Sequence, residues 1–229
     1  MKKQVLMAVF GAALMALAAT PVSASITVSR LYVVGKIGAA FPSSKDYETG
    51  HSVDADAGFS GEIGIGYNFL TGSNLFGLEA TIGYYNSSGD GQLYGINGNI
   101  DTDVVPIALT AKVGGKLDER FGLYLGAGLD IVLVSSDVSS DRFTVSGFPG
   151  TYRFKGSNND AVFGVHLLAG LTYDITDHVF LGLEGKYMWT GNAKANATAV
   201  DQNGHAVLTL SGKDNANACT VMGLAGVRF

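Results

Sequence analysis

The stretch LYVVGKIGAAF, residues 31–41, alternates between two kinds of residue with a period of two. One set is wholly apolar and comprises Leu31, Val33, Gly35, Ile37, Ala39 and Phe41. The other set carries Lys36 among small and apolar residues. Because successive side chains of a β-strand point to opposite faces, this pattern predicts a strand with one apolar face and one face that accommodates a charge.

Seven further stretches repeat this alternation. They span residues 59–69, 76–85, 104–115, 121–132, 162–173, 179–189 and 220–229. One face of these stretches is continuously apolar, whereas the other carries single charged residues among glycines. A soluble sandwich or barrel would instead place polar residues on its outer face. The pattern therefore predicts an all-β fold, an eight-stranded antiparallel up-and-down transmembrane barrel.

Aromatic residues lie near the ends of the apolar faces and fall into two sets. One set contains Phe41, Phe59, Tyr84, Phe163 and Trp189, and the other contains Tyr67, Phe69, Phe76, Phe121, Tyr173 and Phe229. Transmembrane barrels carry such aromatic belts at the two membrane interfaces. We therefore expect the terminal Phe229 to lie in an interfacial belt and not in water.

The links between the predicted strands alternate between long and short. The long ones span 42–58, 86–103, 133–161 and 190–219, and the short ones span 70–75, 116–120 and 174–178. Long surface loops and short periplasmic turns are the usual asymmetry of outer-membrane barrels. The segments 142–154 and 198–210 resemble ribbons and could add spanning hairpins. Their arms of about five to seven residues are shorter than the roughly 9–11 that a tilted spanning strand needs, which favours eight strands.

The N-terminus has the layout of a secretory signal peptide. Two lysines precede an apolar stretch of 15 residues, 5–19, and small residues follow as far as Ala24. We expect cleavage after Ala24, which divides the chain into a signal peptide, 1–24, and a barrel, 25–229. An uncleaved membrane anchor is the alternative, although the apolar stretch is short for a helical span.

Composition argues against several classes of function. The chain has 15 Lys and Arg against 20 Asp and Glu, a net charge of −5. Without a basic stripe to neutralise phosphates, we expect no nucleic-acid partner. The single cysteine excludes an internal disulfide, and the four histidines fall in separate parts of the predicted barrel. We therefore predict no metal site, no cofactor and no enzymatic activity, an outer-membrane enzyme being the third alternative considered.

The charged residues on the predicted inner faces form a candidate site. They are Lys36, Glu62, Glu79, Lys112, Asp130, His166, Glu184 and Lys186. The interior of an eight-stranded barrel is just wide enough for side chains to fill, and buried charges must be paired to be tolerated. We predict a structural plug of salt bridges. The alternative is a narrow or gated pathway lined by these charges, which would make the protein a small-solute channel.

Four motifs are informative in their order and spacing: LYVVGKIG in the first predicted strand, FGLEATIGY in the third, LGLEGKYMW in the seventh and VRF at the end. With them, residues 30–229 resemble the eight-stranded outer-membrane barrels of the OmpA and opacity-protein type. The resemblance implies location in the outer membrane of a Gram-negative cell. It also implies that the barrel-assembly machinery reads the C-terminus, with Val227 and Phe229 as the signal.

The function that we expect from these observations is a structural or surface-interaction role. The expected partners are outer-membrane lipids, the barrel-assembly machinery during biogenesis, and a surface ligand of the loops that the sequence does not identify.

Overall fold

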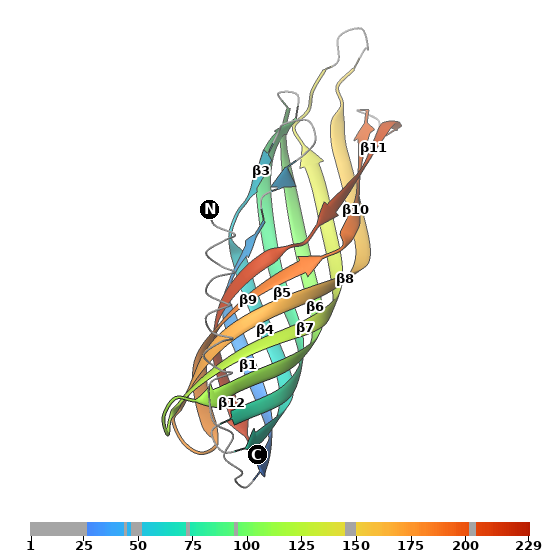
Figure 1. Ribbon diagram of the computed structural model, residues 1–229. Coiled ribbons are helices and arrows are strands. Elements are labelled where there is room, and N and C mark those ends of the chain that lie inside the picture. The colour runs from blue at the N-terminus through green and yellow to red at the C-terminus, as the bar shows by residue number, and fades with distance from the viewer. Residues whose placement is uncertain are drawn as a thin grey trace.

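The structure is a computed structural model that describes residues 27–43, 45–46, 52–71, 74–93, 96–144, 150–201 and 205–229 (Figure 1). The predicted signal peptide, residues 1–24, lies outside the described residues. The described strands are β1 (Thr27–Pro42), β2 (Lys45–Asp46), β3 (Ser52–Ala55), β4 (Gly58–Thr71), β5 (Asn74–Leu93), β6 (Ile96–Lys116), β7 (Phe121–Ser140), β8 (Arg153–Asp174), β9 (Val179–Thr190), β10 (Asn192–Val200), β11 (Ala206–Asn215) and β12 (Ala218–Arg228). In these segments we find no helix long and apolar enough to cross a membrane.

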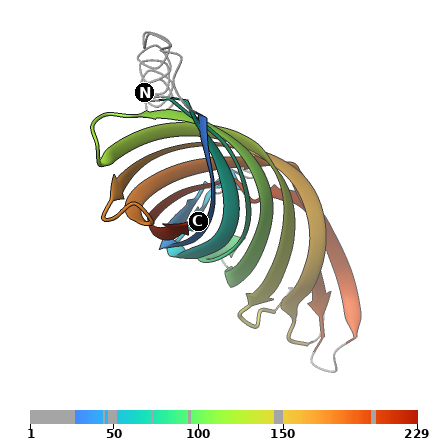
Figure 2. The same ribbon diagram turned by 90° about the horizontal axis from the view of Figure 1, so that it is seen from below.

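Eight strands close into a ring in the order β1, β4, β5, β6, β7, β8, β9 and β12. The ring closes where β12 pairs antiparallel with β1, from Arg228 opposite Tyr32 to Ala218 opposite Pro42. Figure 2 shows the strands curving around a common axis. Seven predicted strands lie within one strand of this ring each, the eighth extends one residue beyond β12, to Phe229, and the predicted eight-stranded antiparallel barrel is confirmed. Closure leaves no unpaired strand edge in the apolar region, where backbone groups would find no water.

The outer face of the ring is apolar, as the alternation predicted. Ile37, Ile63 and Leu129 point outward and are each at least 65% exposed. Ten of the eleven aromatic residues of the predicted belts are also exposed on this face, and Tyr173 is partly buried. Such a continuous apolar surface is suited to lipid and would be unstable in water.

Tight turns join strands at the end of the barrel where the C-terminus lies, here called the lower end (Figure 1). In the turn before β7, Asp118 Oδ1 accepts the backbone N–H groups of Arg120 at 2.7 Å and of Phe121 at 2.6 Å. These two hydrogen bonds, that from Phe121 first, lower the pKa of Asp118 because they stabilise its carboxylate. In the turn before β9, Thr176 Oγ1 takes the equivalent place and accepts the N–H of Val179 at 3.0 Å.

At the opposite, upper end, four strands continue far beyond the ring. The sequence predicted long loops at 86–103 and 133–161, and for most of both segments this was wrong. β5 and β6 pair as far as Leu93 opposite Ile96, and β7 and β8 pair as far as Ser139 opposite Lys155. Apolar alternation marks only the part of a strand that has one face against lipid. Above that level polar residues and glycine predominate in the strands, so the sequence signal is lost although the pairing continues.

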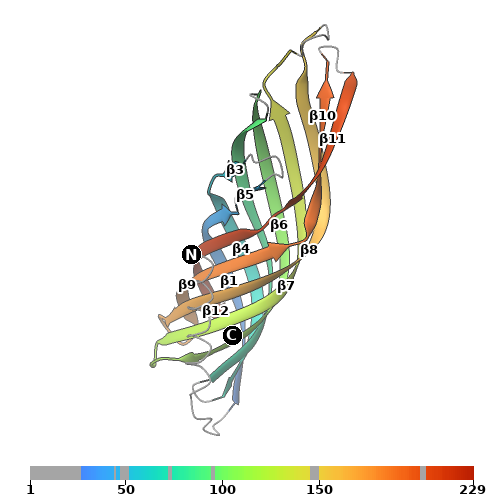
Figure 3. The same cartoon turned by 45° about the horizontal axis from the view of Figure 1, so that its top comes forward.

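The segment 198–210 does form a ribbon, as predicted, but with longer arms. β10 and β11 pair over nine and ten residues, with a bulge between Ala199 and Val200. The hairpin lies above the ring, because β10 continues β9 along β8 and pairs with it through residues 198–200 opposite 153–155, above the level where β9 ends. It widens the upper sheet beside β8 (Figure 3). In the other predicted ribbon, the described residues show a single bridge, Phe143 with Tyr152.

Candidate functional site

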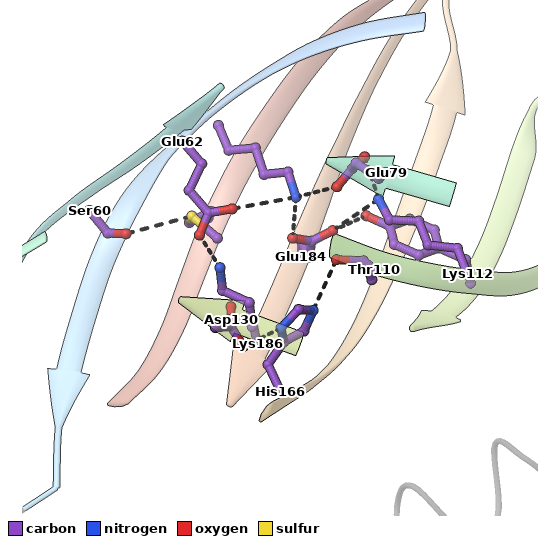
Figure 4. A network of polar contacts seen from close by, with 12 residues as sticks. Ser60, Glu62, Glu79, Thr110, Lys112, Asp130, His166, Glu184 and Lys186 are labelled. Carbon is purple, nitrogen blue, oxygen red and sulfur yellow. Dashed lines mark hydrogen bonds and ion pairs between the residues drawn. The ribbon is translucent and has the colours of Figure 1, made fainter. Parts of the chain in front are cut away.

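The barrel lumen contains all eight charged residues of the candidate site. They are Lys36, Glu62, Glu79, Lys112, Asp130, His166, Glu184 and Lys186, and their exposed fractions lie between 1% and 8%. The period of two accounts for this placement, since each residue stands at a position of its strand from which the side chain points into the lumen. Figure 4 shows the contacts among them.

Two lysines and two glutamates form the centre of the network. Lys36 Nζ lies 2.9 Å from Glu79 Oε1 and 2.6 Å from Glu184 Oε1. Lys112 Nζ lies 2.6 Å from Glu79 Oε2 and 3.6 Å from Glu184 Oε2. Each carboxylate therefore contacts both ammonium groups, and the four residues come from β1, β5, β6 and β9.

Two tyrosines complete the hydrogen bonding of these carboxylates. Tyr32 donates its hydroxyl to Glu79 Oε2 and Tyr124 donates to Glu184 Oε2, each at 2.7 Å. The Lys112 ammonium also lies 4.7 Å from the centre of the Tyr124 ring, a cation–π distance. The sequence pattern alone did not assign these tyrosines to the site. Their positions in the alternation indicate that both tyrosines point into the lumen. The sequence does not indicate which glutamate each hydroxyl contacts.

The side chain of each tyrosine lies next to a glycine of the neighbouring strand. A Cβ atom added at Gly66 would overlap the ring of Tyr32, and one added at Gly170 would overlap the ring of Tyr124. The tyrosine, the glycine and the glutamate thus occupy three successive strands twice, in β1–β4–β5 and again in β7–β8–β9. The same three-residue arrangement therefore occurs in both halves of the barrel. Glycine is needed at its centre because the aromatic ring of the tyrosine occupies the space that a side chain would fill.

A second part of the network lies nearer the upper end. Lys186 donates a hydrogen bond to Glu62 Oε1, and Lys36 Nζ lies 3.7 Å from Glu62 Oε2. The Glu62–Lys186 pair is therefore joined to the central group through Lys36. Ion pairs this deeply buried need compensating partners. Among the described residues, Glu62 Oε2 has the Lys36 ammonium nearby but accepts no hydrogen bond.

Beside this pair, Thr110, His166 and Asp130 form a hydrogen-bonded chain. His166 Nε2 lies 3.0 Å from Thr110 Oγ1, and His166 Nδ1 lies 2.7 Å from Asp130 Oδ2. The order hydroxyl, imidazole and carboxylate resembles that of a catalytic triad. All three side chains are at most 2% exposed, so the hydroxyl is closed to substrates, and the chain instead links β6, β8 and β7. The sequence pattern alone did not assign Thr110 to the site.

Apolar layers border the charged network on both sides. The upper layer consists of Ala40, Tyr85, Val104, Val132, Val134, Val162, Met188, Ala193 and Ala218. The lower layer consists of Tyr32, Val34, Phe180 and Leu224. The upper layer draws on strands around the ring above the charges, whereas the lower layer covers only the side formed by β1, β9 and β12. On the opposite side Tyr124, which donates to Glu184, lines the cavity at the lower mouth.

The lower mouth of the barrel holds a cavity of about 530 Å³, whose lining includes Asn68, Lys116, Tyr124, Asp174 and Arg228. Arg228 and Lys116 contact the Asp174 carboxylate at 2.6 and 3.1 Å. These contacts form a chain across the mouth from β6 through β8 to β12. In the described part of the chain, no group of three or more His, Cys, Asp or Glu residues is arranged to hold a metal ion.

The C-terminal residues Val227 and Phe229 lie on the outer wall of the lower end. Their exposed fractions are 42% and 73%. The Phe229 N–H donates to the carbonyl oxygen of Leu31 at 2.8 Å, which attaches the last residue to β1. Beside it is an apolar depression of about 480 Å³ lined by residues that include Val33 and Ala225.

Comparison with known proteins agrees with this geometry. The sequence model for the outer membrane protein beta-barrel domain matches residues 10–207. No curated protein matches the sequence. The chain is similar to the solved structure of a major outer membrane protein from Thermus thermophilus, with 12% identity, 88% of this chain and 100% of that chain covered, and a TM-score of 0.60. For the outer membrane protein OprG from Pseudomonas aeruginosa, the values are 15% identity, 89% and 97% coverage, and a TM-score of 0.57. At these identities the likeness concerns the fold alone.

Proposed function

This chain belongs to the outer membrane protein beta-barrel domain family, and we propose that it is an outer-membrane protein with a closed lumen that acts through its upper sheet at the cell surface. In this proposal the lower end, with its tight turns, faces the periplasm, and the upper end is extracellular. Outer-membrane lipids cover the apolar wall. The barrel-assembly machinery reads the C-terminal strand during biogenesis, with Val227 and Phe229 as the signal.

The observation that carries the closed lumen is the pairing of the buried charges beneath an apolar layer that draws on strands around the ring. A conducting pathway needs water beside its charged groups, but the ammonium groups here have carboxylates as neighbours. Val132 in the upper layer is 0% exposed and Tyr32 in the lower layer is 3% exposed. Opening the lumen would require the ion pairs and the upper layer to separate together. This supports a plug that stabilises the barrel.

The upper sheet supports the surface-interaction part of the proposal. Strands β5 to β8 and the β10–β11 hairpin project beyond the level where β9 ends, and their residues are mostly polar. A plug of the lumen does not require strands that project above the ring. Projecting binding segments on a rigid scaffold are the usual way in which such proteins present an interaction surface.

Conductance measurements test the closed lumen directly. The full chain without its signal peptide, refolded and inserted into a planar lipid bilayer, should show no steady open state. Ser157→Ala, at an exposed position of β8, is the matched control. Steady conductance that changes in Glu79→Gln or Lys112→Met, and stays unchanged in the control, would contradict the closed lumen.

A small-solute channel is the second candidate function. The cavity of about 530 Å³ at the lower mouth favours it, since it already provides a vestibule that reaches Tyr124. For conduction, the central charges would have to exchange partners and open a continuous path above that residue. The same bilayer experiment separates the two candidates.

A further inference from the structure

We propose that the cavity at the lower mouth binds the carboxylate or phosphate group of a small solute. Asn68 supplies a hydrogen-bond donor on one side of the bound group, and Lys116 and Arg228 supply donors on the other. In the orientation proposed above the solute is periplasmic, and this part of the inference rests on the proposed function. The site itself goes beyond that function, because it lies at the end of the barrel opposite the upper sheet.

The cavity has the size of a ligand pocket. Its volume of about 530 Å³ lies within the range of roughly 300–1,000 Å³ that small-molecule pockets occupy, and the mouths of barrels are a common place for them. Gly122 and Thr172 both line it. A Cβ atom added at Gly122 would come within 2.7 Å of Thr172 Oγ1, so a side chain there would narrow the cavity and cover the hydroxyl.

Asn68 is the side chain that indicates a ligand. It lines the cavity and is 8% exposed, and its Oδ1 has no hydrogen-bond partner among the described residues. Oδ1 lies against β5, where a Cβ atom added at Gly77 would overlap it. The Nδ2 group is therefore the end of the amide that is turned toward the cavity. Because a buried polar group costs free energy unless it is hydrogen-bonded, an acceptor on a ligand would supply the missing partner.

Three charged groups face Asn68 across the barrel. In the order of the eight-stranded ring, β4, β6, β8 and β12 are evenly spaced, with one strand between each and the next. Arg228 of β12 and Lys116 of β6 reach Asp174 of β8 from its two sides, at 2.6 and 3.1 Å. Asn68 lies on β4, the strand opposite β8. The cavity is therefore bordered by an amide donor on one side and by two cations on the other.

The charges of this group favour an anion. Two cations share the single carboxylate of Asp174, which leaves one excess positive charge. The guanidinium of Arg228 contacts Asp174 through Nη1, and its fork of five N–H donors suits carboxylate and phosphate oxygens. Arg228 Cζ also lies 4.3 Å from the centre of the Phe180 ring, a cation–π contact that orients the guanidinium.

The remaining charged residues of the lining lie on the exposed rim. Glu119 and Arg120 belong to the turn before β7, Asp177 belongs to the turn before β9, and all three are exposed. Water and salt screen charges at such positions. They should therefore affect binding less than Arg228, whose side chain is 13% exposed.

These donors define the class of ligand. The side-chain nitrogen groups of Asn68, Lys116 and Arg228 donate hydrogen bonds and do not accept them, so an oxyanion is the complementary group. A neutral sugar could pair with Asn68 but would leave the excess positive charge uncompensated. The Thr172 hydroxyl provides a further contact for a polar substituent of the solute.

Titration followed by NMR tests the site. The full chain without its signal peptide is refolded in dodecyl maltoside micelles, whose headgroups carry neither phosphate nor carboxylate. It is titrated at constant ionic strength with glycerol 3-phosphate and with gluconate. Either probe should cause saturable shifts of the backbone amide resonances of Asn68, Thr172, Asp174 and Arg228. Uncharged glycerol at the same concentrations should cause none.

Asn68→Leu separates binding from stability. It removes the donor and the unpaired buried amide together, so binding of both probes should weaken at least about tenfold while the midpoint of urea unfolding stays equal or rises. Arg228→Met should weaken binding to a similar extent, with heat-modifiable gel migration as the check that the barrel has folded. Glu119→Gln on the exposed rim is the matched control and should change the affinity less than about twofold.

Several results would contradict the proposal. Equal shifts with glycerol would show that the anionic group is not recognised, and wild-type affinity in Asn68→Leu would remove the amide from the site. Loss of probe binding in dodecylphosphocholine micelles would mean that a headgroup phosphate occupies the cavity in place of a free solute. Failure of the closed lumen is distinguishable from all of these, because it appears as steady conductance and not as a change in probe binding.

Discussion

Glu79 is the carboxylate on which the central network depends, and Glu79→Gln tests that network with almost no change of shape. Glu79 accepts hydrogen bonds from Lys36 at 2.9 Å, from Lys112 at 2.6 Å and from Tyr32 at 2.7 Å, and it is 1% exposed. Glutamine removes the negative charge and replaces one acceptor with a donor. Both lysines then share Glu184 as their nearest carboxylate. The new amide N–H group of glutamine also faces one of the groups that donated to Glu79.

Breaking a buried ion pair by removing one partner costs roughly 3–5 kcal/mol, because the remaining charge stays buried without compensation. We expect a loss of that size for Glu79→Gln. The measurement is urea unfolding of the refolded barrel in lipid vesicles, followed by the fluorescence of Trp189, the single tryptophan of the sequence. Ser157→Ala, an exposed change on β8, should shift the free energy of unfolding by less than about 0.5 kcal/mol.

A double variant separates the loss of stability caused by an uncompensated buried charge from the loss caused by missing contacts. Glu79→Gln with Lys112→Met removes one charge of each sign, so the lumen keeps the same charge balance as the wild type. Its loss should be clearly smaller than the sum of the two single losses, because neighbouring sites in one network are coupled. If Glu79→Gln were as stable as Ser157→Ala, or if the two losses were additive, the reasoning about the network would be refuted.

Three further predictions concern positions outside the central carboxylates. Gly66→Ala should destabilise the barrel by about 1–3 kcal/mol because the ring of Tyr32 must move, whereas Gly35→Ala, where an added Cβ meets no atom within 4 Å, should be nearly neutral in the same urea titration. The lowered pKa of Asp118 means that its carboxylate stabilises the turn above its unfolded pKa, and that this contribution is lost as the pH falls through its folded pKa. Amide protection in the turn, measured by hydrogen exchange, should therefore fall in acid for the wild type. In Asp118→Asn, amide protection should not change over the same pH range. Deletion of Phe229 should reduce surface protease accessibility in cells far more than it changes heat-modifiable gel migration of the refolded protein, and equal surface levels would remove the assembly-signal interpretation.

The sequence shows which residues of a strand point to the same face, and this alternation predicted that the charged residues lie in the lumen. Lys36 and Ile37 are neighbours in the chain, and their opposite exposure follows from the period of two. The pairing of the charges is different, because Lys36 and Glu184 are 148 residues apart. Their contact depends on the stagger between strands around the ring, which the alternation of a single strand does not encode.

The upper strands illustrate a second limit. Hydrophobic alternation reports which solvent each face meets, and it reports pairing only indirectly. Where a strand leaves the lipid, both faces accept small polar residues, as in the Ser135–Ser140 end of β7. The ladder continues there because its register is carried upward from the ring. The same absence of pattern would describe a loop, and sequence reasoning could not distinguish the two.

The charged network also explains how the register of the ring is specified. A slip of one residue exchanges the two faces of a strand. For β1, such a slip would turn Lys36 toward lipid and Ile37 into the lumen, and a lysine facing the bilayer midplane costs roughly 2–4 kcal/mol. It would also remove Lys36 from Glu79 and Glu184 and leave Lys112 as the nearest ammonium group to both carboxylates. A purely apolar lumen would carry no such penalty, so the buried ion pairs select one register even if apolar residues could pack the space equally well.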